Sequence, residues 1–182
     1  MTNILEKAQT ERKLSRFSKG VQSVGELVKT LSGPGPFTLF VPSDDAFDRL
    51  SAEQQANLFQ DPEKLAKVLK YHVAPGYYRA DDLFDHIFLK TLEGPRLRVW
   101  ADIYLTPLGE EEVRMGDAMN FIAKDTVTAA VRESIKINGA HIIQADLPAE
   151  NGIMHVIEKV LHPPFLSLGK APREGEKAGQ RA

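Results

Sequence analysis

The sequence contains no cysteine and no long apolar run, and each absence excludes a class of protein. Without cysteine there are no disulfide bonds, no thiolate nucleophile and no cysteine-ligated metal site. No apolar run approaches the roughly 18 residues that a membrane-spanning helix requires. The net charge of -2 offers no basic field for a phosphate backbone, so we do not expect general nucleic-acid binding. With 182 residues, 42% of them hydrophobic and 26% charged, the composition is typical of one soluble globular domain.

The sequence also lacks the common motifs of active sites and metal sites. It has no HxH or HExxH spacing, no glycine-rich phosphate loop and no GxSxG elbow. Lys136 and His141 are expected to be cross-strand neighbours with His155 in the adjoining strand, so a loose histidine pair is conceivable. No carboxylate is placed to orient such a pair. We therefore predict no catalytic residue, no metal and no cofactor, and keep an enzyme that uses His72, His141 or His155 as an alternative.

The N-terminus, MTNILEKAQTERKLSRF, alternates charged and apolar residues. A secretory signal needs a continuous apolar region after a basic start, and that region is missing. The sequence as written therefore predicts a cytoplasmic protein, unless a signal was removed.

Among the helices predicted before residue 73, two set the environment of residues discussed below. The first is one amphipathic helix that lies on the core, because apolar residues recur at spacings of three and four from Leu14 to Leu31. The second begins at Asp61-Pro62-Glu63, which supplies an N-cap and a proline at the first helical position, and runs to about His72. Its apolar face places His72 toward the core and Tyr71 at the flank. We favour a buried, hydrogen-bonded His72 over a ligand or general base.

The stretch GPGPFTLFVPSDDAF, residues 33–47, reads as a turn, a buried strand and a helix start. Ser43 is a candidate N-cap, with Asp44 and Asp45 in the first helical turn, where the helix dipole favours negative charge. Adjacent carboxylates on a helix point about 100° apart and share a proton or a metal poorly. We therefore interpret this pair as capping residues rather than as acid/base catalysts.

Strands dominate the second half of the chain. From Leu97 to Leu105 apolar residues alternate with a mixed face that carries Trp100 and Tyr104, which are either covered or exposed as a contact surface. Asn138-Gly139 predicts a two-residue hairpin. A strand buried near its start is expected from Ile153 to Leu161. Residues 166–182 are predicted to form a polar, flexible tail.

Three blocks of the sequence together resemble the fasciclin (FAS1) domain family. They are LSGPGPFTLFVPSDDAF at residues 31–47, KYHVAPGYYRADDL at 70–83 and INGAHIIQADLPAENGIMHVIEKVLHPP at 137–164. The resemblance, that of a single-domain bacterial-type member, covers about residues 3–164. It implies one α+β domain at residues 1–165, a β-sandwich or wedge flanked by several helices. It also implies a set of residues that fix the fold: Thr38, Ser43, Asp44, Phe47, Asn138, Gly139 and His155.

The resemblance further implies a non-enzymatic protein-interaction or adhesion-type module with a protein partner. The Tyr-His positions linked to receptor binding in some extracellular members fall on Tyr71 and His72. Some relatives bind carotenoids, so a small apolar ligand is the alternative function. Family members are mostly secreted or anchored, which would suggest a secreted or periplasmic protein.

This chain departs from the family pattern by an insertion at about residues 101–134. The segment is longer than an ordinary loop and contains strand-like runs, so we expect it to extend the sheet. Function is often carried by such elaborations. We therefore predict that four side chains at or in the insertion are available to a partner: Trp100, Tyr104, Met115 and Phe121.

Overall fold

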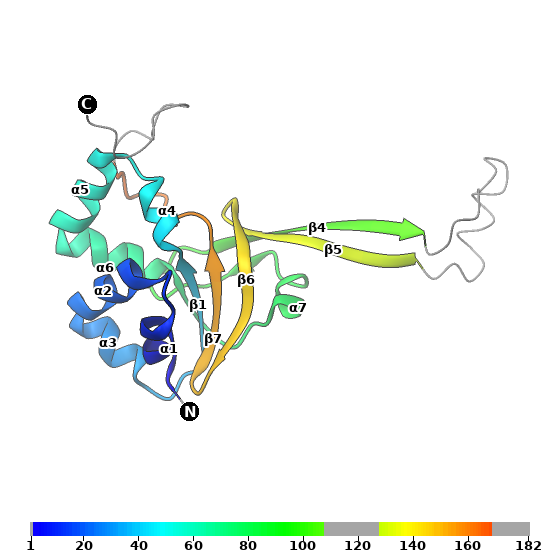
Figure 1. Ribbon diagram of the computed structural model, residues 1–182, viewed down its shortest axis with the longest axis horizontal. Coiled ribbons are helices and arrows are strands. Elements are labelled where there is room, and N and C mark those ends of the chain that lie inside the picture. Colours follow the sequence, from blue (N-terminus) through cyan, green and yellow to red (C-terminus); the bar gives the residue numbers. More distant parts are fainter. Residues whose placement is uncertain (1, 108–127, 169–182) are drawn as a thin grey trace. The chain divides into compact units, whose positions relative to one another are not determined.

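The computed structural model describes residues 2–107 and 128–168, with the side chains of 2–101 and 134–168. Figure 1 shows the helices and strands along the chain. The helices are α1 (Ile4–Thr10), α2 (Ser15–Ser23), α3 (Gly25–Leu31), α4 (Asp44–Asp48), α5 (Ala52–Gln60), α6 (Pro62–Tyr71) and α7 (Ala80–Leu83). The strands are β1 (Phe37–Pro42), β2 (Val73–Pro75), β3 (Phe88–Leu89), β4 (Leu97–Pro107), β5 (Thr128–Ile137), β6 (Ala140–Ala149) and β7 (Gly152–Ile157).

All seven of these strands belong to one sheet in the order β2-β1-β7-β6-β5-β4-β3. Strand β1 is parallel to β7 and antiparallel to β2, so segments far apart in sequence meet at the centre of the sheet. Strands β5, β6 and β7 form consecutive antiparallel pairs. The first of these hairpins turns at Asn138-Gly139, where both residues have positive φ, as predicted.

Both faces of the central strands are buried, because a separate apolar core lies against each. Leu39 and Val41 of β1 belong to a core shared with helices α1 to α6, whereas Phe40 between them belongs to a second core. The second core also takes residues from β3, β4, β5 and β7, which are not all neighbours in the sheet, so the sheet curls around it. This double burial explains the continuous apolar run of β1. The α+β fold class is confirmed.

The single helix predicted from Leu14 to Leu31 is wrong, because the chain breaks at Val24 into α2 and α3. Val24 has φ -106° and ψ 86°, outside the helical region, and Gly25 begins the next helix. Both helices bury apolar residues against the same core, among them Val21 and Leu27. The apolar spacing therefore continues across the break at Val24. Spacing alone does not show that the segment forms two helices.

The predicted corner between β1 and α4 is present, with Asp44 and Asp45 in the first turn of α4, and Asp44 also caps a second helix. The Ser43 hydroxyl accepts from the backbone N–H of Ala46 and caps α4, as predicted. The Asp44 carboxylate accepts from the Ser15 hydroxyl and the Arg16 backbone N–H at 2.8 and 2.9 Å. These groups lie at the start of α2, whose own N-cap residue makes no capping hydrogen bond.

The other predicted fold residues sit in the core or against it. The Thr38 hydroxyl donates to the Gly76 carbonyl and accepts from the Tyr78 backbone N–H, both at 2.9 Å, and so holds the loop after β2. Phe47 is buried in the first core. The Asn151 side chain accepts from the Ile4 N–H and donates to two carbonyls near the end of α3. It joins three chain segments.

One environment and two boundaries differ from the predictions. Tyr71 is only 2% exposed and belongs to the second core, so its placement at the helix flank is wrong. Strand β7 ends at Ile157 rather than at Leu161, since the chain leaves the sheet there. Residues 166–168 are not part of a free tail, because Leu168 is buried and its carbonyl accepts from the Asn57 side chain.

The chain divides into two compact units. One comprises residues 1–100 and 135–182, and the other comprises residues 101–134, the range that the sequence analysis treats as an insertion. Within the second unit the structure describes parts of β4 and β5. Met115 and Phe121 lie outside the described residues, and so does the side chain of Tyr104.

Candidate functional site

Two large aromatic side chains are exposed on one face of the sheet at its β3–β4–β5 edge. Trp100 and Phe88 are each 52% exposed. Phe88 of β3 lies opposite Arg98 of β4, and Trp100 follows two residues later, so the three share a face. Their neighbours Leu97 and Val99 point the other way into the second core. We call the surface formed by Phe88, Arg98, Trp100 and Lys136 the Trp100 face.

The Trp100 face combines aromatic and cationic groups. The Arg98 guanidinium lies 5.2 Å from the centre of the Trp100 ring, a cation–π arrangement. A shallow hollow of about 480 Å³ is lined by Arg98, Trp100, Lys136 and the Asn138-Gly139 turn. The predicted hairpin turn and the predicted aromatic residue thus meet at one site.

A chain of hydrogen bonds from the core supports this face. The buried Tyr71 hydroxyl donates to the Arg96 carbonyl at 3.2 Å and accepts from the Asn138 amide at 2.7 Å. The Asn138 side-chain oxygen accepts from the Arg98 backbone N–H at 2.7 Å, and the Arg98 carbonyl accepts from the Asn138 N–H. Burial raises the pKa of Tyr71, so its hydroxyl stays protonated and able to donate. Tyr71 therefore positions the face without being part of it.

The strands that form this edge and the connection between β3 and β4 carry more positive than negative charges. Residues 88–107 and 128–141 contain Lys90, Arg96, Arg98, Arg132 and Lys136, against Glu93, Asp102 and Glu133. The chain as a whole has a net charge of -2. The edge is therefore a locally positive region on a slightly acidic chain.

Sequence reasoning identified Trp100 but missed part of its surroundings. Arg98 could have been assigned to the site, because the two-residue period of a strand places it on the same face as Trp100. Phe88 gave no signal, since β3 has only two residues and shows no period. Lys136 was considered only as a neighbour of His141, which the register confirms.

His72 is fully buried, as predicted, and both of its ring nitrogen atoms are engaged. Nδ1 donates to the Val68 carbonyl at 2.7 Å, and Nε2 accepts from the Leu161 backbone N–H at 3.0 Å. Burial, with a smaller contribution from the nearby His162, lowers its pKa to about 4. A partner cannot reach this side chain, or Tyr71 beside it, in this conformation.

His155 is also buried, and it does not pair with His141. Its Nε2 donates to the Tyr78 carbonyl at 2.8 Å, and its Nδ1 accepts from the Asp146 N–H at 3.2 Å. Its ring stacks on Phe40 at 5.6 Å. Burial lowers its pKa. With both ring nitrogen atoms occupied, His155 fixes the loop before α7 and offers no free base to a substrate.

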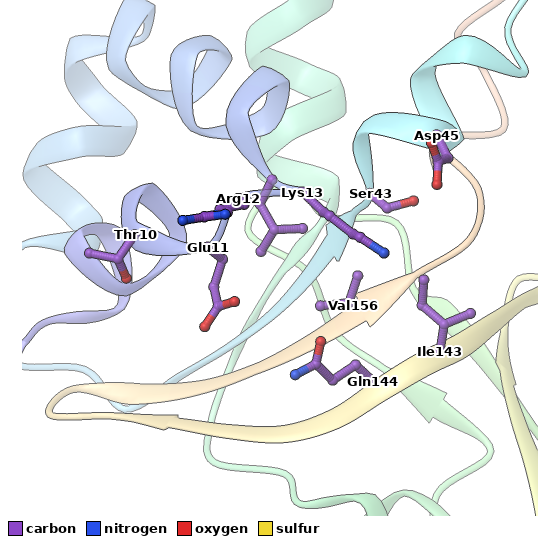
Figure 2. Close-up of a pocket in the computed structure, with 10 residues that line it drawn as sticks. Thr10, Glu11, Arg12, Lys13, Ser43, Asp45, Ile143, Gln144 and Val156 are labelled. Carbon is purple, nitrogen blue, oxygen red and sulfur yellow. The ribbon is translucent and has the colours of Figure 1, made fainter.

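A second hollow lies between the α1–α2 connection and strands β6 and β7 (Figure 2). Its volume is also about 480 Å³. Apolar Val156 and Ile143 line it from the strands, whereas Glu11, Arg12 and Lys13 approach from the connection. Seven of its ten lining residues are polar or charged, whereas pockets for small apolar ligands are lined mainly by hydrophobic side chains.

Among the side chains of residues 2–101 and 134–168, no cluster of three or more could ligate a metal ion. No helix in the same residues has the length and apolar character needed to cross a bilayer.

Comparisons with known proteins agree with this architecture. A family model for the fasciclin domain matches residues 12–163. Protein sll1483 of Synechocystis is 34% identical over 153 residues, which cover 82% of this chain and 68% of that protein. Human periostin is 24% identical over 166 residues, which cover 90% of this chain but only 16% of periostin. A relative from Plasmodium falciparum named heme ligase is 27% identical over 139 residues, covering 73% of this chain and 61% of that protein.

Among solved structures, a FAS1 domain pair from the insect cell adhesion molecule Fasciclin I matches with a TM-score of 0.56. At 20% identity, over 84% of this chain and 46% of that chain, this match shows the fold alone. The family model supplies the stronger evidence because it matches most of the sequence, including all three blocks noted above. The chain belongs to the fasciclin domain family.

Proposed function

We propose that this chain is a non-enzymatic protein-interaction module and that the Trp100 face is its contact surface. The observation that carries the proposal is an exposed tryptophan held in place by a stacked arginine on a sheet edge. Tryptophan and arginine are enriched at the centres of protein interfaces, where they contribute most of the binding energy. The family also includes proteins named for adhesion, such as Fasciclin I.

The state of the buried histidines supports a non-enzymatic role. His72 and His155 are the most strongly buried titratable candidates for acid/base work, and each uses both ring nitrogen atoms in the fold. A general base must be within reach of a substrate proton. Neither ring meets that condition in the described structure.

The test is affinity purification from the native host with the wild-type chain and a Trp100→Ala variant. Truncating Trp100 removes exposed contact area and leaves the core untouched, so the variant should keep its circular dichroism spectrum. We expect a stoichiometric partner with the wild type and at least a tenfold loss with the variant, about 1.4 kcal/mol. A Phe165→Ala variant, which truncates another exposed aromatic, should retain the partner.

Equal recovery with Trp100→Ala would contradict the assignment of this face. An absorption spectrum of the same eluate tests the alternative function. A visible chromophore without a protein partner would make the chain a ligand carrier instead.

A further inference from the structure

We propose that His155 and Asp146 form a pH-sensitive latch. Protonation of His155 moves the Asp146 carboxylate from the Ala80 backbone N–H to the histidine ring, and this movement releases the beginning of α7. The latch is independent of the Trp100 face, so it can hold or fail whatever that surface binds. It follows from the hydrogen bonds around the ring and from the backbone conformation of Asp146.

Three strands hold the segment that leads into α7. The Thr38 hydroxyl of β1 accepts from the Tyr78 N–H at 2.9 Å. His155 of β7 donates from Nε2 to the Tyr78 carbonyl at 2.8 Å. The Asp146 carboxylate of β6 accepts at 2.8 Å from the N–H of Ala80, the first residue of α7. Two of these three attachments therefore depend on side chains that titrate.

The His155 ring cannot take up a second proton in its present position without losing a hydrogen bond. Its Nε2 faces the Tyr78 carbonyl, which can only accept, so Nε2 carries the hydrogen. Nδ1 is therefore unprotonated and accepts from the Asp146 backbone N–H at 3.2 Å. A proton added to Nδ1 would point at this N–H, so two donors would face each other and the bond would be lost.

Asp146 also supplies a negative charge that can take the added proton as a hydrogen bond. Burial lowers the pKa of His155, whereas the bond to Tyr78 and the charge of Asp146 oppose that shift. A hydrogen bond between a carboxylate and a charged imidazolium is stronger than one between a carboxylate and a backbone N–H. Once Nδ1 is protonated, the Asp146 carboxylate therefore gains by turning to the ring, and the Ala80 N–H loses its acceptor.

The backbone at Asp146 allows this movement. The pairing of β6 with β7 shifts between Gln144 and Leu147, so Asp146 lies in a bulge outside the regular ladder. Its φ of 57° is in the left-handed region, which aspartate adopts more readily than most residues. A rotation at this position therefore leaves the paired residues of the two strands in place.

Asp146 is the charged group that faces His155. From β1 the ring meets Phe40, an uncharged ring that stacks on it at 5.6 Å. From the α7 side, Tyr78 turns its own ring to His86, with 5.0 Å between the ring centres. The charged residues at positions 76–83 are Arg79, Asp81 and Asp82. They make no contribution to the shift in the pKa of His155, whereas Asp146 does.

The latch opens as the pH falls below the ordinary histidine pKa of 6.5. In the closed state burial lowers the pKa and keeps the ring neutral. In the released state the ring pairs with Asp146 and binds a proton at least as readily as an ordinary histidine. Protons therefore favour the released state, by roughly tenfold for each pH unit until His155 also protonates in the closed state.

Amide hydrogen exchange of the full chain, followed by NMR between pH 8 and pH 5, tests the latch. The Ala80 N–H is the reporter, because its acceptor is the Asp146 carboxylate. After correction for the intrinsic effect of pH on exchange, its protection should fall by roughly tenfold for each pH unit below 6.5. Amides of β1 and β7 should stay better protected at every pH, because they exchange only through wider unfolding.

Three variants separate the latch from a general loss of stability. His155→Gln removes the titrating group, so the protection of Ala80 relative to β1 and β7 should no longer depend on pH. Asp146→Asn keeps an acceptor for Ala80 but removes the charge, so release should begin at a lower pH. His72→Gln is the matched control, because it removes the other buried histidine and should release Ala80 as the wild type does.

Protection of Ala80 that falls only in step with that of β1 and β7 would overturn the inference. A pH-dependent release that persists in His155→Gln would also overturn it. If His155→Gln does not fold, Asp146→Asn decides the question, because release at the same pH as in the wild type contradicts the role of the Asp146 carboxylate.

Discussion

The buried His72 leads to a quantitative prediction for the pH dependence of stability. The pKa of His72 is about 4 in the folded chain, against an ordinary value of 6.5. Above pH 6.5 the ring is neutral in both the folded and the unfolded chain, and its contribution to stability is fully present. As the pH falls from 6.5 to 4, the unfolded chain binds a proton that the folded chain does not, so stability is lost.

The size of the loss follows from the shift in pKa. A pKa difference of one unit corresponds to 1.36 kcal/mol, so the full loss is about 3 kcal/mol. Roughly 2 kcal/mol of it has been lost by pH 5. The physical cause is that a charged imidazole must be desolvated and must give up the hydrogen bond that Nε2 accepts from Leu161.

Urea unfolding followed by circular dichroism between pH 8 and pH 5 measures this effect. Other groups also titrate, so the quantity to compare is the pH dependence of the wild type and of His72→Gln. The variant should be less stable at pH 8, because a buried N–H loses its acceptor, and it should lose about 2 kcal/mol less than the wild type on going to pH 5.

Val68→Ala is the matched control, since it weakens the same core but keeps the His72 ring and the backbone carbonyl to which it donates. Its stability should fall with pH in parallel with the wild type. If His72→Gln also ran parallel, His72 would not hold the depressed pKa, and this account of the core would be refuted.

Three further predictions concern polar groups that join distant segments. Asp44→Ala should cost about 1 kcal/mol in urea unfolding, because it uncaps α2, whereas Asp45→Ala next to it should be near neutral; equal effects would contradict the capping role. Asn151→Ala should cost about 2–4 kcal/mol, since it leaves buried donors and acceptors unpaired, and a cost below 1 kcal/mol by the same assay would argue against this junction. Tyr71→Phe should lower stability by about 1–2 kcal/mol and alter Trp100 emission through the loss of its bond to Asn138, and unchanged emission would contradict the proposed support.

The parts of the fold that local chemistry decides could be predicted from the sequence. The Ser43 cap and the Asn138-Gly139 hairpin depend on residues within a few positions of each other, and both are confirmed. The break at Val24 could not be predicted, because α2 and α3 pack on one core and keep the same apolar spacing. Asp44 acts across 28 and 29 residues of sequence, a distance at which no pattern signals a contact.

The candidate site was predictable only in part for a similar reason. Strand alternation placed Trp100 on the mixed face of its strand, either covered or exposed, whereas the two-residue strand that carries Phe88 has no readable period. Tyr71 was assigned to the wrong environment because its helix face is set by a second core, contributed by strands much later in the chain. Helix periodicity identifies one apolar face and does not anticipate a second.

The most direct test of the central claim is photo-crosslinking from the Trp100 face. Benzoylphenylalanine replaces Phe88, which leaves Trp100 and Arg98 intact, or replaces the exposed Phe165 as the control, and each chain is irradiated with the material captured from the native host. We predict a crosslinked partner from position 88 and none from position 165. A partner crosslinked from position 165 alone would contradict the claim that the Trp100 face is the contact surface.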